Sequence, residues 1–222
     1  MQKTPHIAMA VMVAAFAFGS APARADDAAM TADVNHLRSE WERITYLVKD
    51  HGAQLDQINA LGKEADAVVA RYPDKAEPLL WDGIITSETA GIASMFHQLG
   101  LAKDARKLFE RALAIDPKGL NGSVIMSLGV LYYRVPGFPV GFGDDDVARH
   151  DLEQALAMDP DGLDANYFYG DFLVEQGDYA KAKTVLTHAL AAPVNPDRPV
   201  WDTGRRGEVK ALLAKVDKHL AS

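Results

Sequence analysis

Two runs of aspartates are the residues in this chain whose type and spacing come closest to a metal-binding motif. Three aspartates run through 144–146, and three more lie at 159, 161 and 164. Clustered carboxylates can hold Ca²⁺, but an EF-hand loop needs acids or amides at alternating positions, then Gly, then Glu at its twelfth position. Neither run has that pattern. Both lie near expected helix starts, where acidic side chains are favoured by the helix dipole. We therefore predict no metal site.

Catalytic motifs are not found elsewhere in the sequence. The histidines after residue 25 are His36, His51, His97, His150, His188 and His219, and they form no HExxH motif and no pair four residues apart. No G-x-S-x-G, Walker A or Rossmann glycine pattern occurs. The chain has no cysteine, so it has no thiolate nucleophile or thiolate metal ligand. These observations predict a protein that is not an enzyme and that needs no cofactor.

An apolar loop at 134–143 is the first candidate binding element. It reads RVPGFPVGFG, and its two prolines make it stiff, so little entropy is lost when it binds. Phe138 and Phe142, with Tyr132 and Tyr133 just before the loop, could line or gate a pocket. Alternatively, both phenylalanines pin the loop onto the core. The sequence leaves these two interpretations open.

A repeated helical phrase must position these residues. It reads LAKDARKLFERALAIDP at 101–117, DDVARHDLEQALAMDP at 145–160 and DYAKAKTVLTHALAAP at 178–193. Each copy has Ala, a large apolar residue four positions later, Ala-Leu three positions after that, and then Pro. Repetition at this scale predicts an all-α fold of stacked helical hairpins, and no strand signal competes with it.

The copies resemble the tetratricopeptide repeat (TPR), a helix-turn-helix unit of about 34 residues. The third copy matches best, through Gly170, the turn Gly177-Asp178-Tyr179, and Ala182, Leu186 and Ala189. The middle copy matches at Leu128-Gly129, Tyr132, Ala148, Leu152, Ala155 and Pro160, and the first at Gly100, Ala105, Phe109, Ala112 and Pro117. The resemblance covers residues 74–195. It implies an interaction role, with a concave binding surface built by the first helix of each unit.

The spacing within the first two units departs from the TPR pattern. Gly170 and Ala182 are 12 residues apart, whereas Gly83 and Ala105 are 22 apart and Gly129 and Ala148 are 19 apart. These units therefore carry extra residues between their paired helices. Insertions in solenoid repeats map to loops on one face, often the binding face.

Amphipathic patterns outside the repeats predict further helices. We expect one disordered segment at 26–30, helices at 31–49 and 53–72, and one long or bent helix at 76–98. The expected units are 31–73, 74–117, 118–160 and 161–195, and a final helix at 203–221 lies in a C-terminal cap at 200–222. The first pair would be a degenerate N-terminal cap. Two caps favour a monomer.

The first 25 residues have the features of a secretory signal peptide. Lys3 precedes an apolar stretch at 7–19, and Ala23-Arg24-Ala25 suits cleavage after Ala25. Without a cysteine the protein cannot be a bacterial lipoprotein. We predict that residues 26–222 form a single periplasmic domain without membrane insertion. Its acidic charge, −8 for the whole chain, argues against nucleic-acid binding.

The resemblance predicts which residues form the concave wall. They are Glu77, Leu80, Ile84, Ser123, Met126, Val130, Tyr133, Asp164, Tyr167 and Asp171. This mixture of apolar and acidic residues suits an amphipathic peptide, a hydrophobic small molecule or a basic partner. Alternatively, the apolar segment at 84–99 fills the groove with the protein's own side chains.

We predict a TPR-type adaptor that binds a protein or peptide partner. The predicted binding residues are Met126, Val130, Tyr132, Tyr133, Phe138, Phe142, Tyr167 and Asp171. The alternative is a binding or accessory protein for a small hydrophobic ligand, associated with a transporter. A cavity enclosed by Tyr132, Phe138, Phe142 and Tyr167 would support that alternative.

Overall fold

The structure is a computed structural model that describes residues 21–221. That part of the chain forms nine α-helices, and its only bridge is an isolated one between Gly137 and Gly143. The helices are α1 (Ala21–Leu47), α2 (His51–Arg71), α3 (Ala76–Ile92), α4 (Met95–Ile115), α5 (Ser123–Arg134), α6 (Asp145–Met158), α7 (Leu163–Glu175), α8 (Tyr179–Ala191) and α9 (Pro199–Leu220). Most of the predicted signal peptide lies outside the described residues. The expected disorder at 26–30 is wrong, because these residues belong to α1.

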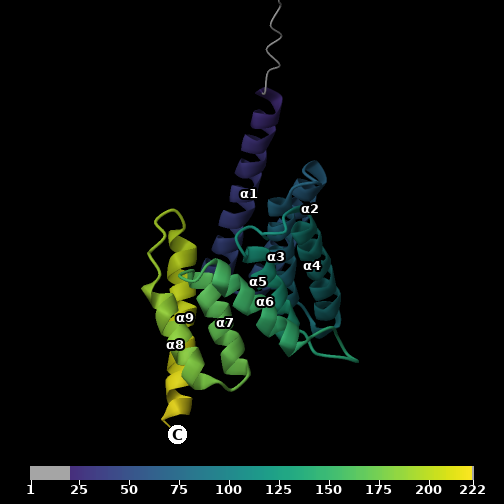
Figure 1. Ribbon diagram of the computed structural model, residues 1–222. Helices are drawn as coiled ribbons and strands as arrows, with labels where there is room; N and C mark the ends of the chain where they lie inside the picture. The colour runs from purple at the N-terminus through teal and green to yellow at the C-terminus, as the bar shows by residue number, and fades with distance from the viewer. Residues whose placement is uncertain (1–20, 222) are drawn as a thin grey trace, which may run out of the picture.

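Three helical hairpins stand side by side, which confirms the all-α, TPR-like fold (Figure 1). They are α3–α4, α5–α6 and α7–α8, and each hairpin also contacts the next one. The helix pair α1–α2 packs before them and α9 packs along α8. Within residues 21–221, none of these helices has both the length and the apolar character needed to cross a bilayer.

A glycine lets the two helices of each hairpin approach closely. A Cβ atom added to Gly83 would lie 2.4 Å from the Phe109 ring, and one added to Gly170 would lie 2.6 Å from Leu186. The middle hairpin repeats this contact at 2.9 Å, between Gly129 and Leu152. The three large residues are nearly inaccessible to solvent. The repeated phrase of the sequence therefore encodes one helix crossing that is used three times.

Gly83→Ala is expected to destabilise the protein by about 1–3 kcal/mol, because the added methyl group must displace the buried Phe109 ring. Gly91→Ala, in the same helix, is the matched control, since a Cβ there meets nothing within 4 Å. The control should be neutral or stabilise by up to about 1 kcal/mol through helix propensity. Urea unfolding measures both, and equal effects would contradict the close crossing.

The extra residues of the first two units are accommodated in different ways. In the first unit they lengthen both helices, and the break lies at Ala93–Ser94. The single helix expected at 76–98 is therefore wrong, because 95–98 is the first turn of α4. In the second unit the extra residues form the loop between α5 and α6. The third unit has only a short turn around Gly177, whose φ of 76° suits glycine.

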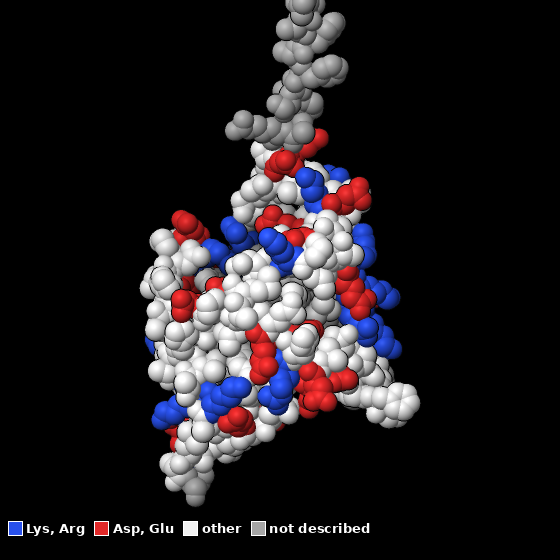
Figure 2. Space-filling view, viewed as in Figure 1, with Lys and Arg blue, Asp and Glu red and all other residues white. Residues whose placement is uncertain are grey.

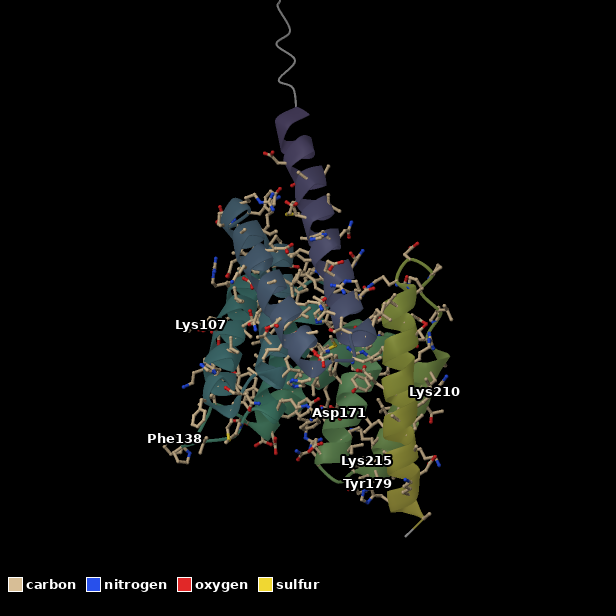
Figure 3. The ribbon with its side chains drawn as sticks, turned by 180° about the vertical axis from the view of Figure 1, so that it is seen from behind. Lys107, Phe138, Asp171, Tyr179, Lys210 and Lys215 are labelled. Carbon is tan, nitrogen blue, oxygen red and sulfur yellow. The ribbon has the colours of Figure 1, made fainter. Side chains whose placement is uncertain are left out.

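The first and last helices of the described chain touch each other. Arg198 at the start of α9 donates a 2.6 Å hydrogen bond to Glu42 on α1, across 156 residues of sequence. The Tyr46 ring of α1 lies against Gly204 of α9, where an added Cβ would be 2.2 Å away. Figures 1 and 3 show α1 running toward α9, and α1 contacts α3, the first helix of the first hairpin, as well as α9. The N-terminal helix thus covers part of the concave side.

Candidate interaction surface

The helices α5 and α7 bring together the predicted concave residues Tyr133 and Asp171. The Tyr133 hydroxyl donates a 2.7 Å hydrogen bond to the Asp171 carboxylate, which also pairs with Arg134. Burial raises the pKa of Tyr133 well above its usual value, and the Asp171 charge raises it further. The hydroxyl therefore stays protonated and serves as a donor. Figure 3 shows Asp171 beyond the C-terminal end of α1, and its side chain is only 7% exposed.

Arg205 of α9 is the centre of a second cluster on this side. Its guanidinium lies 4.5 Å from the centre of the Tyr167 ring and 4.7 Å from that of Phe168. It forms ion pairs with Asp164 and Glu208, each at 2.7 Å, and its side chain is 8% exposed. Burial raises the pKa of Tyr167 to about 12. A helix outside the repeats thus completes the wall that α7 begins.

Negative charge is in excess around Arg205. Glu88 of α3 is close enough to Arg205 and Glu208 for both charges to act on its pKa. Burial raises the pKa of Glu88, and repulsion from Glu208 adds to this. Burial likewise raises the pKa of Glu208, against the attraction of Arg205, and Asp164 raises it further. Three carboxylates therefore share one guanidinium, which favours the approach of another cation.

Glu88 has no partner of its own to offset this charge. Within residues 21–221, it makes no hydrogen bond and no ion pair. The Tyr46 hydroxyl donates a 3.4 Å hydrogen bond to Glu208, and the charge of Glu88 also raises the pKa of Tyr46. An acidic, tyrosine-lined concave surface results. We define this concave surface as Glu88, Val130, Tyr133, Tyr167, Asp171 and Glu208.

The part of the groove beside these residues is filled by α1 and α9. Trp41 of α1 packs edge-on to Trp81 of α3, with ring centroids 5.8 Å apart. The expectation that the 84–99 segment fills the groove is wrong at its C-terminal end, because Met95 and Phe96 are 78% and 91% exposed. Helices outside the repeats do the filling, and Tyr133 and Tyr167 remain partly exposed.

Two depressions lie beside the part of the groove that α1 and α9 fill. Met126, a predicted binding residue, lines a pocket of about 200 Å³ with Asp159 and Trp201. A larger open groove, about 560 Å³, runs between α1 and α9 and is bordered by Tyr46 and Leu47. Neither depression contains the aromatic residues of the 134–143 loop.

The four aromatic residues whose enclosure of a cavity would have supported the small-ligand alternative lie apart. Tyr132 and Phe142 pack edge-on to each other at 5.8 Å and cover Arg106 of α4. Tyr167 lies on the concave surface instead. Phe138 is 93% exposed and encloses nothing. Phe142 thus pins the loop to the core, whereas Phe138 does not.

The aspartate runs have structural partners. The Asp144 carboxylate accepts hydrogen bonds from the backbone N–H groups of Asp146 and Val147, so it caps α6. Asp161 contacts His188 at 2.9 Å, and Asp164 pairs with Arg205. Across the described residues, no group of three His, Cys, Asp or Glu side chains is arranged to hold a metal ion.

Sequence reasoning missed Glu88, Arg205, Glu208 and Tyr46. Glu88 is the one that lies in a hairpin with a glycine crossing. The other three lie on α1 and α9, whose sequences carry no repeat signature. Arg205 had one usable signal, since it lies in the same helical stripe as Trp201 and Val209, both buried. A charged residue in an apolar stripe indicates a buried ion pair.

These features define a class of protein, the helical-hairpin repeat solenoids. A family model described as tetratricopeptide repeat matches residues 142–216, which span α6 to α8 and most of α9. The part of the chain from 142 to 216 is thus similar to tetratricopeptide repeats, and the described residues share the fold of TPR proteins. No curated protein sequence matches it.

Solved structures share this fold at low sequence identity. A crystal structure of a thermophilic TPR protein from Thermus thermophilus is 17% identical, with a TM-score of 0.56, covering 85% of this chain and 91% of that one. A MamA mutant is 17% identical with a TM-score of 0.47, covering 88% and 98%. A crystal structure of MamA is also 17% identical, with a TM-score of 0.43 and coverage of 73% and 88%.

Proposed function

We propose that this protein is an adaptor that binds a basic segment of a partner protein on its concave surface. TPR folds are interaction scaffolds, and the catalytic motifs sought in the sequence do not occur in it. The observation that carries the proposal is the unpaired Glu88 beside Glu208, on a partly exposed surface that includes Tyr133 and Tyr167.

The chemistry of this surface selects the partner's side chains. A Lys or Arg group placed near Glu88 and Glu208 would offset the excess negative charge. The rings of Tyr133 and Tyr167, which already stack with Arg134 and Arg205, offer apolar contact area as well. A peptide with alternating basic and apolar residues uses both features, whereas an acidic peptide would be repelled.

The proposal places the adaptor in the periplasm as a monomer. It rests on the signal-peptide features of residues 1–25 and on the helices at both ends of the repeats. Cell fractionation with N-terminal sequencing tests the location, and a mature chain beginning at Asp26 in the periplasmic fraction is the expected result. An uncleaved chain in the cytoplasm would contradict it.

A photo-crosslinking amino acid tests the surface directly. It is introduced at Glu175, which lies 3.9 Å from Arg134 beside the concave surface, and separately at the exposed Lys103 on α4. Position 175 is expected to yield one dominant protein adduct in cells, and position 103 is not. Equal labelling at both positions would contradict a concave binding site.

Glu88→Gln is expected to weaken binding of the captured partner about tenfold, which is about 1.4 kcal/mol. It removes an unpaired carboxylate without changing the size of the side chain, so the fold should persist. Glu110→Gln, on the exposed side of α4, is the matched control and should leave binding unchanged. Isothermal titration with the purified partner measures both. Equal effects of the two variants would exclude the charge complementarity.

A further inference from the structure

The loop between α5 and α6 is held in one shape by its own backbone. Gly143 donates a 3.0 Å hydrogen bond to the Pro136 carbonyl, and Asp144 donates one of 2.9 Å to Tyr132. Gly141 donates to the Gly137 carbonyl at 3.1 Å, which closes the turn at the far end. Together with Phe142, which packs on Arg106, these contacts make the loop a rigid support.

This support presents apolar side chains to solvent. Phe138 is 93% exposed and Val140 is 66% exposed. Gly141 lies against Leu99 of α4, one turn from Met95 and Phe96, which are 78% and 91% exposed. Figure 3 shows Phe138 projecting from the edge of the molecule. We call Met95, Phe96, Phe138 and Val140 the apolar tip.

The apolar tip is unfavourable in water and favourable in a pocket. Removing large apolar side chains from water is favourable, so leaving several of them exposed gives up a considerable free energy. Scattered exposed apolar residues are ordinary, but a contiguous group rimmed by polar residues marks an interaction site. The rigid loop reduces the entropy lost on docking, and an aromatic anchor supplies a large contact area.

Negative charge lies at the base of the tip. Asp145 and Asp146 follow directly after the loop, in the first turn of α6, and both are exposed. Within the described residues neither side chain makes a hydrogen bond or an ion pair. Figure 2 shows acidic side chains beside the white protrusion at the lower right. The rim of the tip is therefore free to pair with cations.

We propose that the apolar tip inserts into an apolar pocket of a partner protein, with Lys or Arg at the pocket rim facing Asp145 and Asp146. Charge complementarity decides the occupant. An anionic lipid surface would repel the two aspartates. A symmetric pairing of two copies through their tips would bring both acidic pairs together. This contact is separate from the concave surface and gives the adaptor a second attachment point.

Photo-crosslinking tests the tip in the full-length protein. A benzoyl-phenylalanine at position 138 is compared with one at Val194, which is 70% exposed at a distant place in the chain. Position 138 is expected to label one protein that position 194 does not label. Asp145→Lys with Asp146→Lys should reduce that adduct at least about tenfold while leaving the concave-surface adduct at position 175 unchanged.

Three crosslinking results would overturn the proposal. They are equal labelling at 138 and 194, an adduct at 138 that survives the charge reversal, and an adduct consisting of two copies of this chain. Vesicles of neutral phosphatidylcholine, with and without phosphatidylserine, provide the lipid arm. Sedimentation of the purified protein with either vesicle, lost in Phe138→Ser, would also overturn it. Because the 175 adduct is scored separately, failure at the tip is distinguishable from failure of the proposed adaptor function.

Discussion

Arg198→Ala is expected to cost about 3–5 kcal/mol of stability, because it leaves Glu42 buried without its counter-ion. The Glu42 side chain is 8% exposed, and Arg198 is its one hydrogen-bond or ion-pair partner in the described part of the chain. Arg198 also covers Trp201, with its guanidinium 4.4 Å from the centre of that ring. Thermal and urea unfolding should both show the loss.

Two controls separate burial of the charge from loss of the contact. Glu42→Gln combined with Arg198→Met removes both charges and should recover most of the stability. Lys183→Ala breaks an exposed pair between α8 and α9, 2.8 Å long, and should cost no more than about 1 kcal/mol. If Arg198→Ala costs as little as Lys183→Ala, Glu42 is not a desolvated partner.

Asp82→Asn is expected to stabilise the protein by about 2–4 kcal/mol at pH 8 and to have little effect at pH 3. Burial raises the pKa of Asp82 to about 7, and the nearby Asp66 charge raises it further against the pull of Thr86 and Arg111. In the unfolded chain Asp82 ionises near its usual value of 3.8. The favourable contribution of the protonated acid is therefore complete below about pH 4 and is lost as the pH rises to 7.

Urea unfolding from pH 3 to pH 8 measures this effect as the difference between wild type and Asp82→Asn. The difference should grow between pH 4 and pH 7 and stay constant above. Asp56→Asn, on the exposed side of α2, is the surface control and should show no such growth. A difference that is constant across the whole range would mean that Asp82 titrates alike in both states.

The repeated phrase was sufficient to predict the hairpins, because one physical contact recurs. Ala105, Phe109 and Ala112 all lie in the buried stripe of α4, as their spacing predicts. The prolines at 73, 117 and 160 each follow a helix end, as expected for residues that cannot continue a helix. On the concave side, Tyr133 and Asp171 could be placed from the repeat alone, since both lie on the first helix of their units.

Contacts between distant helices could not be predicted in this way. The pairing of Glu42 with Arg198 depends on how far the superhelix turns, and no periodic signal relates α1 to α9. The boundary at Ala93–Ser94 was missed because Gly91 is the residue in this segment that disfavours a helix most, and it indicated a bend there instead. The direction of Phe138 was also open, because a loop with two phenylalanines can bury either, and the hydrogen bonds that decide it involve only backbone atoms.

The contact of α1 with α9 also bears on how the chain reaches its final state. In an ordinary repeat array each unit touches only its neighbours, so folding can spread from any point and the terminal units open easily. Here the packing of the first helix depends on the last, because Glu42 and Tyr46 can contact Arg198 and Glu208 only after residues 198–208 have been synthesised. During synthesis from the N terminus, one side of α1 is therefore uncovered until the end. Once they have met, α1 and α9 protect each other, and they should exchange their amide hydrogens with the repeats as one cooperative unit.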